Sequence, residues 1–190
     1  IEELISLEVV TEAFEIVCAL SRVDGVPESH FHSLEAVEHI INVITVFDNE
    51  GTNVLGGITQ DQWEFVMLCA LGTLWGIASG DHCPRFTVNH VAEILRIAHK
   101  TEEEDDEHQE ELEYVIFGIL GCVAWRGGDG LALLTRKENL DFSMGFLYND
   151  SLRIKENCAC TISWVLKNSN TIDMYDAVFD TLVASLEHNK

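Results

Sequence analysis

Basic residues are scarce in this sequence, in which 11 Lys and Arg stand against 33 Asp and Glu for a formal net charge of −22 at pH 7. A surface this acidic repels the phosphate backbone of nucleic acids and anionic lipid headgroups. We therefore expect the chain to bind neither nucleic acid nor membranes. Cationic partners are favoured, although acidity of this kind usually serves solubility alone.

Sequence signatures of catalysis are also missing. There is no G-x-S-x-G nucleophile elbow, no H-E-x-x-H zinc helix and no phosphate-binding glycine loop. The glycine-rich run Gly127–Gly130 follows a helical pattern rather than a strand, which predicts a helix cap and a turn. Carboxylate pairs such as Glu12 and Glu15 are explained as solvated helix faces. We therefore predict that the chain is not an enzyme and uses no cofactor.

Histidine and cysteine do not fall at the spacing of a zinc site. His30 and His32, with His39 nearby, would point the same way in a strand but diverge in a helix. Cys158 and Cys160 are separated by one residue, whereas zinc-finger cysteines are separated by two or more. We predict no bound metal, and a metal-dependent enzyme or sensor built on His and Cys is the remote alternative.

The cysteines also indicate a compartment. Most lie inside apolar helical stretches, where a free cysteine behaves as a small hydrophobic residue, and a disulfide framework is typical of short secreted chains. We therefore expect a reducing compartment, the cytoplasm or the nucleus. The six cysteines are Cys18, Cys69, Cys83, Cys122, Cys158 and Cys160.

The stretch Gln62–Gly80 organises the rest of the chain. It is apolar on nearly every side, and a helix without a polar face must be buried between other helices. Its length of about nineteen residues is that of a membrane span. However, Glu64 lies at its start, and no Lys/Arg asymmetry flanks it. We predict a buried core helix.

Three other stretches repeat this pattern of a polar start, a compact apolar run and a polar or glycine stop. Aligning one position in each of the four gives spacings of 54, 46 and 42 residues. A helical unit that recurs every 40–50 residues predicts a stacked α-solenoid, because each unit buries its apolar faces only against its neighbours. The aligned positions are Arg22, Gly76, Cys122 and Trp164, and the core helices are expected near 8–24, 60–79, 111–126 and 153–168.

Shorter amphipathic helices are expected between these core helices, and no segment has a convincing strand pattern. We treat residues 1–190 as a single domain, and as a piece of a longer protein because the chain opens on what looks like the end of a repeat. The other expected segments are a helix over Ser29–Phe47, a loop over Asp48–Thr59, a helix over Thr87–His99, an exposed acidic run over Glu102–Glu111, two short helices in Leu131–Leu147 divided near Glu138–Asp141, and a helix over Thr171–Leu186.

The stretch Glu156–Val165 (ENCACTISWV) resembles the third helix of an armadillo repeat as the catenin branch of that family has it. Two further stretches, Leu71–Gly80 and Ala19–Gly25, resemble the end of the same third helix in other members of the family. The resemblance implies an all-α, right-handed superhelix of about four repeats, whose third helices line a concave surface that binds partners. The residues that match the catenin pattern are Asn157, Cys158, Thr161, Ile162 and Val165.

The sequence departs from the peptide-binding members of that family, such as importin-alpha. Those members place Trp and Asn four residues apart on the third helix, and no such pair occurs here, so binding of a nuclear-localisation signal is not carried over. At the positions where those members carry Trp, this sequence has Cys18, Gly72, Gly118 and Cys160. The partner-binding residues that this alignment predicts are Arg22, Gly72, Gly76, Gly118, Cys122, Trp125, Cys160 and Trp164.

Most of these positions are Gly or Cys, which predicts a smooth, shallow trough. Such a trough lacks donors for an extended peptide, so we expect it to accept an apolar helix face, with Trp164 as an anchor. The predicted function is a non-catalytic protein–protein interaction module that binds a helical or basic segment of another protein. The acidic run Glu102–Glu111 would attract a basic segment. The alternative function is a structural repeat segment of a larger assembly, with no ligand of its own. Packing between repeats is the alternative account of the three tryptophans near the ends of the core helices, Trp75, Trp125 and Trp164.

Overall fold

The structure is a computed structural model, and it describes residues 34–54, 60–80, 83, 85–102, 109–169 and 175–188. Every regular element in these ranges is a helix, as the sequence predicts. The described residues fall into two compact units, one within residues 1–84 and one within residues 85–190. The expected helix near 8–24, with Cys18 and Arg22, lies outside the described residues.

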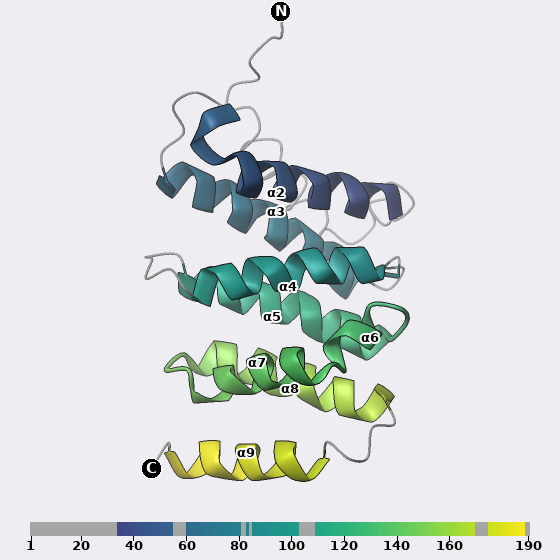
Figure 1. The fold of residues 1–190 in the computed structure, drawn as a ribbon, viewed down its shortest axis with the longest axis vertical. Coiled ribbons are helices and arrows are strands. Elements are labelled where there is room, and N and C mark those ends of the chain that lie inside the picture. The colour runs from purple at the N-terminus through teal and green to yellow at the C-terminus, as the bar shows by residue number, and fades with distance from the viewer. Residues whose placement is uncertain are drawn as a thin grey trace, which may run out of the picture. The chain divides into compact units, whose positions relative to one another are not determined.

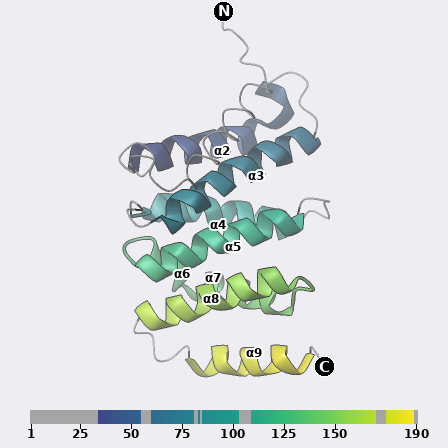
Figure 2. The same cartoon turned by 180° about the vertical axis from the view of Figure 1, so that it is seen from behind.

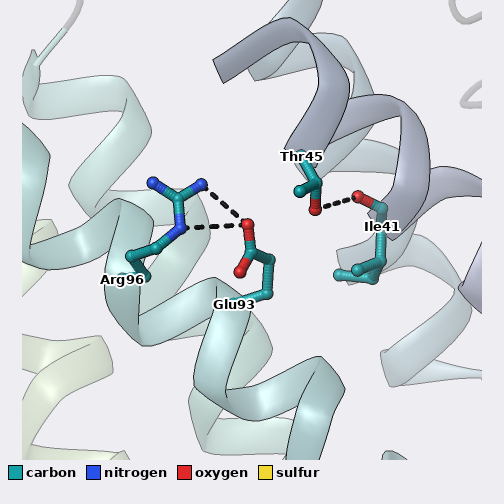
Figure 3. Close-up of polar contacts among 4 residues, drawn as sticks. All are labelled: Ile41, Thr45, Glu93 and Arg96. Carbon is teal, nitrogen blue, oxygen red and sulfur yellow. Dashed lines mark hydrogen bonds and ion pairs between the residues drawn. The ribbon is translucent and has the colours of Figure 1, made fainter. Parts of the chain in front are cut away.

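In the first unit, helix α2 (Leu34–Val54) packs against helix α3 (Gln60–Ser79) (Figure 1). The apolar stripe predicted for α2 is buried, with Val37 and Ile44 fully inaccessible to solvent. On the same helix, the Thr45 hydroxyl donates to the backbone oxygen of Ile41 at 2.8 Å, one turn earlier (Figure 3).

Helix α2 is longer than the sequence predicted, because it continues through residues 48–54, which were expected to be a loop. A single glycine such as Gly51 costs a helix only about 1 kcal/mol, so glycine and asparagine do not by themselves end one. The bounds of helix α3 match the prediction, and Gly80 follows the helix directly. At 3.6 residues per turn, its large buried side chains lie on one face of the helix, whereas Phe65 on the opposite side is 40% exposed, so the prediction of a helix buried on nearly every side is wrong for that side. The buried residues include Val66, Met67, Ala70, Leu71, Leu74 and Ile77.

The second unit is a two-layered helical stack. Helices α5 and α8 lie side by side in one layer, and α4, α6 and α7 form the other (Figures 1 and 2). The Tyr148 hydroxyl donates to the Thr181 backbone oxygen of α9 at 3.5 Å. The bounds are α4 Val88–Glu102, α5 Gln109–Arg126, α6 Leu131–Leu134, α7 Lys137–Gly145, the 3-10 helix η2 Phe146–Tyr148, α8 Leu152–Ser169 and α9 Tyr175–His188.

The break between the two short helices lies at Thr135 and Arg136, earlier than the predicted Glu138–Asp141. Arg136 is extended (φ −67°, ψ 139°), and α7 begins immediately after it. The Asn139 amide donates to the Leu133 backbone oxygen at 2.8 Å and thereby closes the turn between the helices. The charged residues that suggested a later break are compatible with the first turn of α7.

The glycine-rich run after α5 forms a helix cap and a turn, as predicted. Gly127 and Gly128 have positive φ angles of 71° and 94°, a region that suits glycine. The Gly127 amide donates to the Val123 backbone oxygen at 3.0 Å. Gly130 is required for a different reason, since a Cβ there would lie 2.6 Å from Cγ2 of Val91 and 3.1 Å from the backbone oxygen of Phe86. The run therefore lets the chain pass close to the start of α4.

Aromatic rings fill the space between α5 and the layer that covers it. Phe117 is 1% exposed, and its ring centroid lies 4.7 Å from that of Phe146 and 6.3 Å from that of Phe142. The His99 ring of α4 lies 3.9 Å from that of Phe142. Elsewhere on α4, Arg96 donates from Nε and Nη2 to one oxygen of Glu93, at 3.0 and 2.7 Å (Figure 3). The ring contacts of Phe117 cover one side of α5, and α8 packs against another side of it.

Candidate partner-binding surface

Helices α5 and α8 run in the same direction (Figure 2). Three α8 side chains donate hydrogen bonds to backbone oxygens of α5. Asn157 Nδ2 reaches the oxygen of Tyr114 at 3.0 Å, and Asn168 Nδ2 reaches that of Ala124 at 2.7 Å. Thr161 Oγ1 lies 3.1 Å from the oxygen of Phe117. The partners are 43 or 44 residues apart in sequence, close to the spacing of 42 that aligns Cys122 with Trp164.

Small residues allow this close approach. A Cβ at Gly121 would lie 3.1 Å from the Thr161 hydroxyl oxygen. Thr161 is 1% exposed, and its hydroxyl also lies 2.8 Å from the Asn157 backbone oxygen, so it has little freedom to move away. Asn157 and Thr161 belong to the stretch that resembles the armadillo third helix, and here they hold two parallel helices together. The pair α5/α8 is therefore a fixed platform.

One side of the α5/α8 pair faces away from the layer of α4, α6 and α7. Along the helices it carries charged residues at one end, small residues in the middle and tryptophans at the other end. We call it the α5/α8 face. Cys122 and Gly121 are half-buried and Cys160 is exposed, so the middle of the face is lined by small residues. The face consists of Glu111, Tyr114, Gly121, Cys122, Trp125 and Arg126 on α5 and of Arg153, Glu156, Cys160, Ser163, Trp164 and Lys167 on α8.

One end of the face holds an ion pair. Arg153 donates to both carboxylate oxygens of Glu111, at 2.8 and 3.4 Å, and its guanidinium carbon lies 4.0 Å from the centroid of the Tyr114 ring. The hydrogen bond to Glu111 raises the pKa of Arg153 above its ordinary value. Because the pair is exposed to solvent, it contributes little to stability. Its effect is to close this end of the face with a charged, ordered cluster.

The other end holds two tryptophans. The ring centroids of Trp125 and Trp164 lie 6.2 Å apart with 51° between the ring planes. Trp125 is 48% exposed and Trp164 is half-buried, so neither indole is part of the core. The Arg126 guanidinium lies 4.9 Å from the Trp125 ring centroid, and the Lys167 ammonium lies 4.3 Å from that of Trp164. We call these four residues the tryptophan–cation cluster.

The predicted partner-binding residues are distributed unevenly. Cys122, Trp125, Cys160 and Trp164 all lie on the α5/α8 face. Gly118 is buried on α5. Gly72 (buried) and Gly76 (half-buried) lie on α3 in the other unit, and Arg22 lies outside the described residues.

Sequence reasoning missed the two cations of the cluster. Arg126 directly follows Trp125, and Lys167 comes three residues after Trp164, which is the spacing of neighbours on one helix face. Only the spacing of Trp164 and Lys167 was an available signal, because adjacent residues such as Trp125 and Arg126 do not share a helix face. Cys158 matches its interpretation as a core residue: it is fully buried, its sulfur lies 2.7 Å from the Ser143 backbone oxygen, and burial raises the pKa of its thiol well above the ordinary value of 9.0.

Two absences hold for the described part of the chain. Among its His, Cys, Asp and Glu side chains, no group of three or more is placed to hold a metal ion. None of its helices is long and apolar enough to cross a membrane. Comparisons with known protein families, with curated proteins and with solved structures give no match.

Proposed function

We propose that this chain is a non-catalytic protein-interaction module, built as an armadillo-like stack of helical repeats, that binds a helical segment of a partner protein on its α5/α8 face. The observation that carries the proposal is the pair of solvent-accessible indoles, Trp125 and Trp164. Large aromatic side chains at a surface are enriched among the residues that dominate binding energy. A soluble protein gains little by exposing two of them side by side unless something covers them.

The chemistry of the face favours a helix over an extended peptide. An extended peptide needs donors and acceptors for its own backbone, and leaving those groups unpaired costs about 1–3 kcal/mol each. The amides of Asn157 and Asn168 already donate to α5 backbone oxygens. A helix satisfies its backbone internally and requires only an apolar surface with room for close approach, which the small residues around Cys122 and Gly121 provide.

The armadillo-like arrangement is supported by the parallel pair α5 and α8. Side-chain hydrogen bonds between the two helices join residues 42 to 44 apart, from Glu111 and Arg153 at one end to Ala124 and Asn168 at the other. Stacked repeats of about that length place their equivalent helices side by side in this way.

A second candidate function, a structural segment of a larger assembly, is favoured by one observation on α9. Phe179 is 66% exposed and Val183, one turn later, is 39% exposed. An apolar pair of this kind at i and i+4 suits packing against a further helix. In that case α9, and not the tryptophan–cation cluster, would carry the main contact.

Affinity capture from cell extract with four versions of the chain separates the two candidates. The versions are wild type, Trp125→Ala, Trp164→Ala and Phe179→Ala, all immobilised at equal amounts of folded protein. A binding module that uses the α5/α8 face loses its captured partner in both tryptophan variants and keeps it in Phe179→Ala. The reverse pattern supports the structural segment and contradicts the proposed function.

A further inference from the structure

We propose that α9 carries a second docking surface, which binds a basic amphipathic helix of a partner protein. The apolar part of this surface is Phe179 and Val183, and its charged part is Asp176 and Asp180. We call these four residues the α9 face. It lies on a different helix from the α5/α8 face, so the inference goes beyond the proposed function and does not depend on it.

The apolar part of the α9 face is not the side that holds α9 in the fold. Val178 is 1% exposed, and the helix packs against η2, where the Tyr148 hydroxyl donates to the Thr181 backbone oxygen. At about 100° per residue, Val183 lies about 140° around the helix axis from Val178. Phe179 is 66% exposed and Val183 is 39% exposed. The pair therefore forms a second apolar side of α9, which solvent reaches.

Two exposed carboxylates lie directly beside this apolar pair. Asp176 comes three residues before Phe179, and Asp180 comes three residues before Val183, which is the spacing of neighbours on a helix surface. The two aspartates are four residues apart, so they form a row next to the apolar row. Like charges at this spacing destabilise a helix, and a cation placed between them offsets that repulsion.

The sequence around α9 supplies no cation of its own for this row. Residues 168–189 contain Asp173, Asp176, Asp180 and Glu187 but neither Lys nor Arg. Elsewhere in the same unit, carboxylates on α4 and α5 are paired with arginines of the chain, as Glu111 is with Arg153. Charge complementarity at the α9 face thus favours Lys or Arg side chains supplied by a partner.

The same charges disfavour two other occupants of the α9 face. A second copy of the chain related by a two-fold axis would bring the same aspartates of both copies together, and like charges at an interface repel. An uncharged helix would bring an apolar surface against the two carboxylates and leave them without a partner. A basic amphipathic helix matches both the apolar row and the acidic row.

Two synthetic amphipathic helices test the inference with the complete 190-residue chain. Both have the same Leu/Phe apolar stripe, and they carry either Lys or Gln at the positions that flank it. Fluorescence anisotropy at 0.15 M salt gives a Kd for each peptide. We expect the Lys peptide to bind about fivefold more tightly, since two exposed ion pairs add a modest amount of binding free energy.

Two charge variants separate the α9 face from the overall charge of −22. Asp176→Asn/Asp180→Asn should reduce the preference for the Lys peptide to less than about twofold. The matched control is Glu138→Gln/Asp141→Asn, which also removes two exposed charges, one of them in the first turn of its helix, α7. It should leave the preference unchanged. Equal effects of the two variants would assign the preference to overall charge and overturn the α9 face.

Variants of the apolar residues locate the peptide. Phe179→Ala should weaken binding of the Lys peptide about tenfold without a large change in melting temperature, because the ring is exposed. Trp164→Ala should leave this binding unchanged, since Lys167 beside that indole disfavours a basic peptide there. Binding that is lost in Trp164→Ala and kept in Phe179→Ala would support the α5/α8 face and overturn the α9 face.

The remaining outcomes concern the other occupants. Equal binding of the Lys and Gln peptides, lost in Phe179→Ala, would assign the α9 face to an uncharged helix and overturn the basic partner. Self-association of wild type that disappears in Phe179→Ala, measured by analytical ultracentrifugation, would show that a second copy covers α9 and would also overturn it. If neither peptide binds wild type, the α9 face is wrong as a docking surface for a helix.

Discussion

Asn157 of α8 donates its amide to the backbone oxygen of Tyr114 on α5 at 3.0 Å, and this bond joins two helices that start 43 residues apart in sequence. Thr161 and Asn168 repeat the arrangement along the same face. Side chains that bond directly to a neighbouring helix backbone hold the two axes at a fixed separation. The α5/α8 face is therefore ordered before any partner arrives, which reduces the entropic cost of binding.

Asn157→Ala should destabilise the chain by about 1–2 kcal/mol, because it removes an inter-helix hydrogen bond from a half-buried site. Denaturant unfolding followed by circular dichroism measures this change. Ser163→Ala, an exposed substitution on the same helix, is the control and should change the free energy of unfolding by less than about 0.5 kcal/mol. Equal effects of the two variants would show that the Asn157 bond contributes nothing to stability.

Gly130→Ala should destabilise the chain by about 1–3 kcal/mol. The new Cβ would lie 2.6 Å from Val91 Cγ2 and 3.3 Å from Val123 Cγ1, so packed neighbours must shift. Gly145→Ala is the matched control, since no atom lies within 4 Å of a Cβ there and its backbone is helical. That control should be neutral or stabilising by up to about 1 kcal/mol. Thermal unfolding of both variants measures the difference, and a neutral Gly130→Ala would contradict the close approach.

Cys158 and Cys160 should differ sharply in reactivity. Cys160 is exposed and should react with a thiol reagent at pH 8 in the native protein, whereas Cys158 should react only after denaturation, because burial raises its pKa and excludes the reagent. Peptide mapping by mass spectrometry identifies the modified residue. Modification of native Cys158 at the rate of Cys160 would contradict its burial.

The same pKa shift gives a dependence of stability on pH. Above the ordinary value of 9.0 the unfolded chain loses the Cys158 proton, while the folded chain keeps it. Protons then favour the folded state, so stability falls as the pH rises above about 9. Cys158→Ser, which removes the titrating thiol, should weaken this dependence in urea titrations at pH 7 to 10. An unchanged slope in the variant would contradict the shift.

Periodicity and composition predicted most of the helices from the sequence. The pattern around Phe117, for example, placed the third core helix within a few residues of its observed bounds. The expectation that glycine and asparagine end a helix was wrong at Gly51, where α2 continues. The expected position of the break between α6 and α7 was also wrong, because the break lies at Arg136, before Glu138. Helix ends depend on specific bonds such as that of Asn139 to the Leu133 oxygen, and composition does not encode such a bond.

The candidate site was predictable only in part. The alignment of repeats placed Trp164 and Cys122 on equivalent positions, and the structure brings Trp125 and Trp164 together. It gave no indication of Arg126 and Lys167, because a helical repeat constrains the apolar faces and leaves the identity of surface residues free. Asn157 was noticed only as part of a family pattern, and its bond to the Tyr114 backbone oxygen depends on a separation between helices that no single helix defines.

The central claim is that Trp125 and Trp164 bind a partner helix, and the affinity of the captured partner tests it most directly. Isothermal titration calorimetry with wild type and with Trp164→Ala should show a loss of about 2 kcal/mol or more in binding free energy. Trp125→Ala, which removes an indole that is 48% exposed, should do the same with a melting temperature close to that of wild type. Unchanged affinity per folded molecule, together with a large fall in melting temperature, would show that the indoles support the fold and would contradict the binding face.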